Sequence, residues 1–179
     1  MGEVLSLSTL AARVEAGLMD GKTLVTTNGC FDLLHVGHLR YLQAARDCGD
    51  CLLVALNADI SVQRLKGPER PIIPEAERAE LLAGLSCVDY VVIFEEPTPE
   101  VVLRTARPQI HVKGAQYSEA TLPEAPLLRE LGTEMRWIPM VAGRSTSEIV
   151  AKIRTQPSAQ VAQTVPSLEV QADHDCCSG

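Results

Sequence analysis

The segment that most constrains the fold of this chain is Asn28–His38, with the sequence Asn-Gly-Cys-Phe-Asp-Leu-Leu-His-Val-Gly-His. A β-branched run before it predicts a buried strand, and apolar residues at helical spacing after it predict a helix. The free N–H groups and the dipole at a helix start attract anions. His35 and His38 lie three residues apart, so both imidazoles can face one side of the first turn, and Gly37 allows phosphate oxygens to approach the backbone. The segment therefore predicts a phosphate site between a strand and a helix.

Strands and helices alternate along the rest of the chain. We expect strands at 23–27, 51–56, 90–94, 110–112 and 135–139, and helices at 5–18 (capped by Ser8), 36–47, 74–84, 99–106, 125–131 and 147–154. Continuous apolar strands that alternate with helices predict a parallel five-stranded sheet covered on both faces, which is a three-layer α/β domain. Ligands of such sheets bind beyond the carboxyl ends of the strands, where the His35/His38 turn is expected.

Composition indicates one domain over residues 1–154 and a disordered low-complexity tail over 155–179, which is rich in Gln, Ser, Ala, Pro and Val. The net charge of −7 argues against nonspecific binding to nucleic acid. The sequence shows neither an apolar run of about 20 residues nor a secretory signal, so we expect a cytoplasmic protein that does not bind a membrane.

Five segments in order along the chain carry a family resemblance. They are the His35–His38 turn and residues 64–72, 88–93, 112–114 and 143–149. From Leu5 to Arg154 the chain resembles the cytidylyltransferase-like nucleotidyltransferases, and within them the adenylyltransferase branch that makes ADP-heptose from ATP and a heptose 1-phosphate. The resemblance implies a Rossmann-like fold and transfer of AMP with release of pyrophosphate. It also implies Mg²⁺ held mainly by substrate phosphates and water, with no direct metal ligand from the protein. We further expect a homodimer and a separate sugar kinase that supplies the sugar phosphate.

Nucleotidyl transfer needs positioning and charge stabilisation more than a base, because the attacking phosphate oxygen is already an anion. By resemblance, His35 and His38 donate to the triphosphate and stabilise the departing pyrophosphate. Lys66, which we expect in a mobile loop bounded by Gly and Pro, is assigned to the charge that develops at the α-phosphorus. The competing interpretations are capping or core histidines and a solvated surface lysine.

Further residues are expected to contact the nucleotide. They are Asn28, Gly29, Phe31, Asp32, Gly37, Arg78, Lys113, Gly114, Arg144, Ser145, Thr146 and Ser147. Several have a second interpretation. Asp32 caps the helix, orients a histidine or reaches Mg²⁺ through water, and the ring of Phe31 belongs to the core while its N–H faces the nucleotide. Arg78 contacts phosphate or is an exposed helix charge paired with a nearby glutamate, and the hydroxyls at 145–147 bind phosphate or cap the last helix.

The chain departs from the heptose branch at Ala115-Gln116, where members usually have Gly-Asp. This loss of an acid indicates altered sugar specificity or weakened activity. Three rival functions follow: a cytidylyltransferase for an alcohol or sugar phosphate such as glycerol 3-phosphate, a regulatory nucleotide-binding protein, and a redox or metal protein that uses Cys176-Cys177. Arg144 directly before Ser145 matches the heptose branch and favours ATP with a sugar phosphate.

Overall fold

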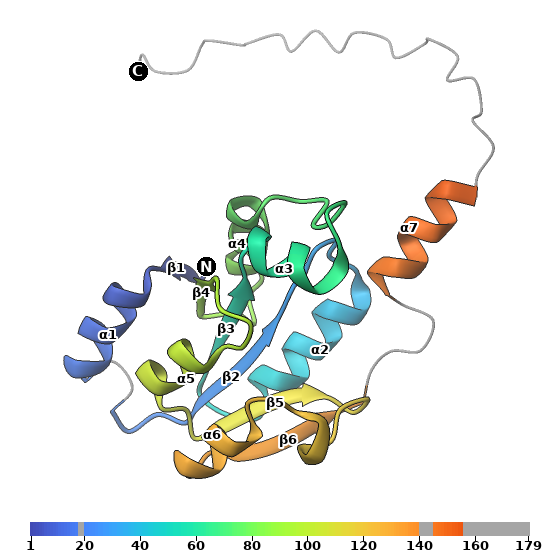
Figure 1. Cartoon of the computed structure of the whole chain (residues 1–179). Helices are drawn as coiled ribbons and strands as arrows, with labels where there is room; N and C mark the ends of the chain where they lie inside the picture. The colour runs from blue at the N-terminus through green and yellow to red at the C-terminus, as the bar shows by residue number, and fades with distance from the viewer. Residues whose placement is uncertain (18–19, 140–144, 156–179) are drawn as a thin grey trace, which may run out of the picture.

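The computed structural model describes residues 1–17, 20–139 and 145–155 as a single sheet with helices on both faces (Figure 1). The strands are β1 (Glu3–Leu5), β2 (Leu24–Gly29), β3 (Cys51–Asn57), β4 (Tyr90–Phe94), β5 (Ile110–Gly114) and β6 (Glu134–Ile138). The helices are α1 (Leu7–Glu15), α2 (Val36–Arg46), α3 (Asp59–Lys66), α4 (Glu75–Ala83), α5 (Glu100–Ala106), α6 (Ala125–Glu130) and α7 (Thr146–Thr155), and a short 3₁₀ turn covers Glu119–Thr121. Apart from Thr155, the expected tail lies outside the described residues.

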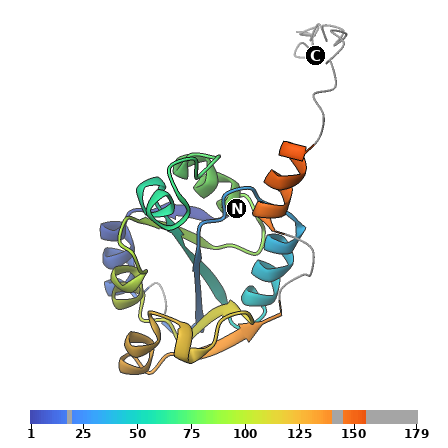
Figure 2. The same ribbon diagram turned by 45° about the vertical axis from the view of Figure 1, so that its right-hand side comes forward.

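Alternation along β3 explains the three layers. Leu52, Val54 and Leu56 pack with α2 and α4 in one cluster, whereas Leu53 and Ala55 pack with α1 and α5 in another. Successive residues of a strand point to opposite faces, so an unbroken apolar strand must be covered on both sides. Figure 2 shows α2 on one side of the sheet and α1 and α5 on the other. The expected Rossmann-like α/β fold is confirmed.

The sheet has six strands rather than the five expected, in the order β1-β4-β3-β2-β5-β6, and every pair is parallel. The missed strand is β1, where we expected the first helix to begin. Ser6, and not Ser8, caps α1 by accepting a hydrogen bond from the N–H of Thr9 at 3.0 Å. A strand of three residues at the edge of the sheet is too short to show the two-residue period by which strands are predicted.

The strand order places a ligand crevice between β2 and β5. From β2 the chain adds β3 and β4 on one side, and then crosses to add β5 and β6 on the other. The connections on the two sides of β2 therefore diverge, which leaves space beyond the carboxyl ends of β2 and β5. No helix in the described part of the chain is both long and apolar enough to cross a membrane.

Candidate active site

A cavity of about 440 Å³ opens at this edge of the sheet and contains most of the expected site. The expected residues that line it are Asn28, Gly29, Phe31, Asp32, His38, Lys66, Lys113, Gly114 and Thr146. The expected residues His35, Gly37, Arg78, Ser145 and Ser147 are described by the structure but lie outside this lining, and Arg144 lies outside the described residues. The carboxyl ends of β2 and β5 thus bring together residues that are 85 positions apart in the chain, such as Asn28 and Lys113.

The two imidazoles of the phosphate turn form a stacked pair with ring centroids 3.9 Å apart and planes inclined by 23°. His38 faces the cavity, while His35 stands behind it as the residue that caps α2. The Nδ1 of His35 accepts a hydrogen bond from the N–H of Gly37 at 3.1 Å, so the proton of a neutral His35 ring is on Nε2. His35 therefore caps α2 and stacks against the ring of His38, and its expected donation to the triphosphate stays a prediction.

His38 is held in its neutral form. Burial is the main cause that lowers the pKa of His38 to about 4, and the nearby charges of His35 and Lys66 add to it. A neutral imidazole donates one N–H and accepts with its other nitrogen. At pH 7 the ring can therefore donate to a phosphate oxygen, and an incoming polyanion would raise its pKa.

The backbone of the phosphate turn bends sharply at Phe31, whose φ of 41° lies in the left-handed region. This bend turns the ring of Phe31 back into the core, where it is 6% exposed and lies 5.3 Å from the ring of His38. The ring also passes over Gly29, where an added Cβ would lie 3.0 Å from a ring carbon. A side chain at Gly29 would therefore press on the ring of Phe31 at the cavity wall.

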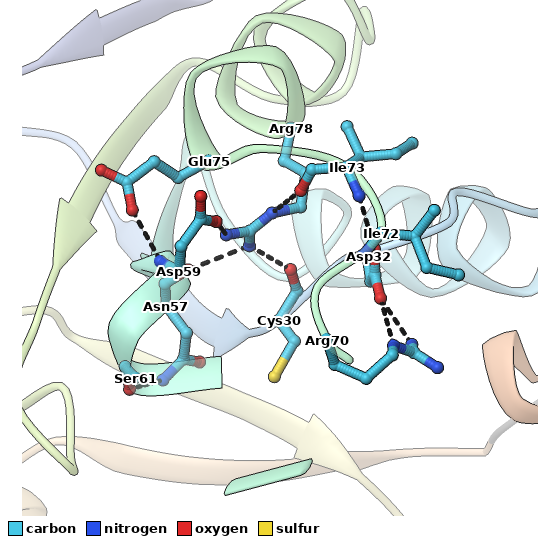
Figure 3. A network of polar contacts seen from close by, with 10 residues as sticks. All are labelled: Cys30, Asp32, Asn57, Asp59, Ser61, Arg70, Ile72, Ile73, Glu75 and Arg78. Carbon is cyan, nitrogen blue, oxygen red and sulfur yellow. Dashed lines mark hydrogen bonds and ion pairs between the residues drawn. The ribbon is translucent and has the colours of Figure 1, made fainter. Parts of the chain in front are cut away.

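Asp32 anchors the loop that follows α3 to the phosphate turn (Figure 3). Its carboxylate is 1% exposed and accepts hydrogen bonds from the Nε of Arg70 at 2.6 Å and from the N–H groups of Ile72 and Ile73 at 2.8 and 3.1 Å. Charge-assisted bonds of this kind fix geometry strongly. Asp32 therefore orients a loop, a role that differs from the helix capping and histidine orientation considered from the sequence.

Arg78 is a buried structural arginine and not an exposed helix charge (Figure 3). Its guanidinium donates to the carbonyls of Cys30, Asn57 and Ile73 and to the carboxylate of Asp59. It thus ties the ends of β2 and β3 to the loop before α4. The side chain is fully buried and does not belong to the cavity lining, so it shapes the cavity from behind.

Lys66 is the last residue of α3 rather than part of a loop, and its side chain is exposed at the rim of the cavity. Gly67 follows with a φ of 94° and turns the chain out of the helix. A lysine on a flexible stem at a helix end can swing toward a bound phosphate. The helix was missed because its polar sequence lacks a clear apolar stripe.

Opposite Lys66, the end of β5 carries Lys113, which is 9% exposed. Its ammonium donates to the side-chain oxygen of Asn28 at 2.9 Å and lies 5.1 Å from the centre of the Tyr117 ring. Burial is the main cause that lowers the pKa of Lys113, against the opposing effect of Glu124. Next to it, the Gln116 amide lies across Gly114, so that a side chain at Gly114 would collide with it.

The start of α7 forms the last wall. Thr146 lines the cavity and donates to the carbonyl of Leu33 at 3.3 Å, which joins α7 to the phosphate turn. Ser145 caps the helix by accepting from the N–H of Glu148 at 3.1 Å, and Ser147 is exposed. Capping and cavity lining are therefore divided between neighbouring hydroxyls.

Sequence reasoning missed three cavity residues of note, Tyr41, Thr98 and Glu124. Tyr41 follows His38 by three residues on α2, so helical spacing could have identified it. Thr98 lies just beyond β4, where the carboxyl-edge rule applies. Glu124 precedes a short helix and resembles an ordinary acid at a helix start, so no sequence signal distinguishes it.

The fold and the cavity define a nucleotidyltransferase of the Rossmann-like α/β class. A family model described as Cytidylyltransferase-like matches residues 26–163, and the chain belongs to this family. The match covers the phosphate turn, both lysines of the cavity and the start of α7.

Two relatives from different organisms show the same similarity. The chain is 52% identical over 153 residues to the bifunctional protein HldE of Geotalea uraniireducens (strain Rf4), covering 86% of this chain and 31% of the relative. It is 49% identical over 143 residues to the bifunctional protein HldE of Streptomyces coelicolor, covering 80% of this chain and 30% of the relative. The chain therefore spans about a third of the length of these relatives and matches one part of each.

Two solved structures resemble the fold. The crystal structure of the lipopolysaccharide core biosynthesis protein from Thermoplasma volcanium GSS1 matches with a TM-score of 0.57 and 28% identity, over 68% of this chain and 98% of that one. A pantoate-beta-alanine ligase from Francisella tularensis matches with a TM-score of 0.57 and 13% identity, over 82% of this chain and 69% of that one. The second likeness concerns the fold alone.

Proposed function

We propose that this domain transfers AMP from ATP to a heptose 1-phosphate, which releases pyrophosphate and yields ADP-heptose. The observation that carries the proposal is the stacked His35/His38 pair, with His38 on the cavity wall where β2 passes into α2. The similarity to HldE proteins and to a protein of lipopolysaccharide core biosynthesis supports the choice of a heptose acceptor. A sugar kinase would supply the acceptor.

In the proposed reaction a phosphate oxygen of the acceptor attacks the α-phosphorus of ATP. A new P–O bond forms, the bond between the α-phosphorus and the bridging oxygen breaks, and pyrophosphate leaves with that oxygen. No proton has to be removed from the nucleophile, so the protein acts by positioning and by stabilising charge. His38 would donate its N–H to a phosphate oxygen, while Lys66 and Lys113 would place positive charge on opposite sides of the cavity.

We propose that Mg²⁺ is bound in this cavity through the substrate. The described residues contain no group of three or more His, Cys, Asp or Glu side chains arranged to hold a metal ion. Asp32 is already engaged by Arg70 and two N–H groups. Mg²⁺ retains water and binds phosphates readily, so we propose that phosphates and water hold it here. When bound, the ion would neutralise part of the triphosphate charge.

A pyrophosphate-release assay tests the proposed function. The protein is given ATP or CTP with Mg²⁺, and each nucleotide is paired with heptose 1-phosphate or glycerol 3-phosphate. We expect turnover with ATP and heptose 1-phosphate to exceed the other three pairings by at least about 100-fold, a discrimination that polar contacts can provide. Preference for CTP would contradict the nucleotide assignment. ATP binding without pyrophosphate release from either acceptor would indicate a regulatory protein.

A further inference from the structure

A buried carboxylate that the proposed chemistry does not use forms part of the cavity wall. Glu124 is 2% exposed, lines the cavity and precedes α6. Its Oε1 lies 3.6 Å from the Nζ of Lys113 and 3.6 Å from the Nε2 of His111, which is longer than a hydrogen bond to either. This oxygen has no hydrogen-bond partner among the described residues. The ion pair with Lys113 offsets the charge of the carboxylate, but the oxygen still lacks a hydrogen bond. A buried acceptor without a hydrogen bond is costly, so such an acceptor on a cavity wall points to a ligand.

Lys113 supplies a donor beside this acceptor. Its ammonium has three N–H bonds, and Asn28 accepts through its side-chain oxygen at 2.9 Å and its carbonyl at 3.3 Å. One N–H therefore remains beyond those that Asn28 accepts, on an ammonium that lines the cavity and lies 3.6 Å from the Oε1 of Glu124. The two groups present one donor and one acceptor a few ångströms apart.

We propose that Glu124 and Lys113 together bind a hydroxyl group of a sugar ring, with the hydroxyl donating to Glu124 and accepting from Lys113. The assignment rests on the proposed function for the identity of the substrates, ATP and a sugar phosphate. A hydroxyl is the group that donates and accepts at one oxygen, so it completes both partners at once.

Other ligand groups match this pair poorly. A phosphate oxygen would meet the negative charge of Glu124 at close range, and a metal ion would meet the ammonium of Lys113. The nearby wall is formed by Tyr117, Leu122 and Pro123, which offers apolar surface to the carbon face of a sugar. Polar groups in fixed positions on a mainly apolar wall are typical of small-molecule sites that select by hydroxyl pattern.

Two sugar rings enter this cavity under the proposed function, the ribose of the nucleotide and the acceptor sugar. The experiment therefore removes a ligand hydroxyl and the Glu124 carboxylate, first each alone and then both together. In the nucleotide arm, calorimetry measures binding of ATP, 2′-deoxy-ATP and 3′-deoxy-ATP. In the acceptor arm, pyrophosphate release gives kcat/KM for heptose 1-phosphate and its monodeoxy analogues. Each arm is run on wild type, Glu124→Gln and Glu124→Ala. Glu130→Gln serves as the control, because Glu130 is the exposed last residue of α6, the helix that Glu124 precedes, and pairs with Arg104 outside the cavity.

We expect wild type and Glu130→Gln to disfavour one deoxy analogue by about 10- to 100-fold, since a hydrogen bond to a charged group is lost. In Glu124→Ala this discrimination falls below about threefold, because the hydroxyl no longer has its acceptor. In Glu124→Gln it falls only partway, because the amide oxygen still accepts but carries no charge. If the Glu124 variants lose discrimination among the ATP analogues, the hydroxyl belongs to the ribose. If they lose it among the acceptor analogues, the hydroxyl belongs to the acceptor sugar. Glu124→Gln keeps the side-chain volume, and its melting temperature is compared with that of wild type to separate folding from recognition.

Equal weakening of every ligand in both arms would overturn the proposal, because Glu124 would then only orient Lys113. A wild-type protein that accepts all deoxy analogues equally would overturn it as well. Failure of the proposed function has a different signature. Ribose discrimination that depends on Glu124, without pyrophosphate release from any acceptor, would refute AMP transfer and support the hydroxyl site.

Discussion

Replacing Arg78 by Met separates the two roles that the sequence allows for this arginine. The methionine keeps most of the apolar stem of the side chain but removes the guanidinium that joins β2, β3 and the loop before α4. Its partners are the carbonyls of Cys30, Asn57 and Ile73 and the carboxylate of Asp59. The substitution therefore tests the hydrogen bonds and leaves little new cavity.

The expected decrease in the free energy of unfolding depends on how well water can replace each lost hydrogen bond. The bond to Asn57 is buried, whereas those to Cys30 and Ile73 are partly buried. An unmet buried acceptor costs about 1–3 kcal/mol, so we assign about 2 kcal/mol to Asn57 and about 1 kcal/mol to each of the other carbonyls. The side chain of Asp59 is 36% exposed and regains water. The total is about 4 kcal/mol, which is a large part of the 5–15 kcal/mol roughly typical of a folded domain.

Urea unfolding monitored by circular dichroism measures this decrease in stability. The comparison holds when the unfolding free energy has the same dependence on urea concentration in both proteins. Arg104→Met is the matched control, since Arg104 is 52% exposed and its ion pair with Glu130 lies in solvent, where such pairs stabilise little. If Arg78→Met lost less than about 1 kcal/mol while the KM for ATP rose about tenfold, the structural role argued here would be refuted and a phosphate contact supported.

Three further outcomes follow from the site. His38→Ala is expected to lower kcat in pyrophosphate release by about 10²–10³-fold, as loss of a single charge-stabilising donor does. His35→Ala acts through the ring that it supports and should lower kcat by about tenfold. Equal losses in the two variants would contradict this division. Lys66→Ala should lower kcat yet shift the unfolding free energy by less than about 0.5 kcal/mol, because the side chain is exposed at the end of α3. Between about pH 6.5 and pH 4 the unfolded His38 binds a proton that the folded ring, with its pKa of about 4, does not bind. Urea denaturation should therefore show that the free energy of unfolding decreases as the pH is lowered through this window, and that it decreases less steeply in His38→Asn.

Much of the fold could be predicted because its strands are apolar and its helices amphipathic. The bounds of β4 agree with the expectation, and α2 differs by one residue at its end. The parallel sheet and the position of the phosphate turn then follow from the alternation of strands and helices. The sequence did not reveal β1 or α3, because one is too short and the other too polar to produce a periodic signal.

The residues of the site also differ in how well the sequence predicts them. Local residues such as His38 could be predicted because they follow one another on a single turn. Arg78 and Glu124 could not be placed, since their environments are set by segments far away in the chain. Arg78 reaches a carbonyl 48 residues before it, and Glu124 lies beside the imidazole of His111 on β5. Burial of a charge is decided by such tertiary contacts, which a single sequence does not display.

The division of labour among the cations of the site follows from their chemistry. The chain carries a net charge of −7, so a polyanionic nucleotide depends on local positive charge. Arg70 and Arg78 have planar forks that match fixed acceptors, and the structure uses them to hold the loop and the strand ends. Lys66 and Lys113 are compact charges that both line the cavity, Lys66 on an exposed stem at the rim and Lys113 buried and held by Asn28. A rigid arginine frame with one buried lysine and one lysine at the rim suits a reaction in which charge moves from the α-phosphate to the leaving pyrophosphate.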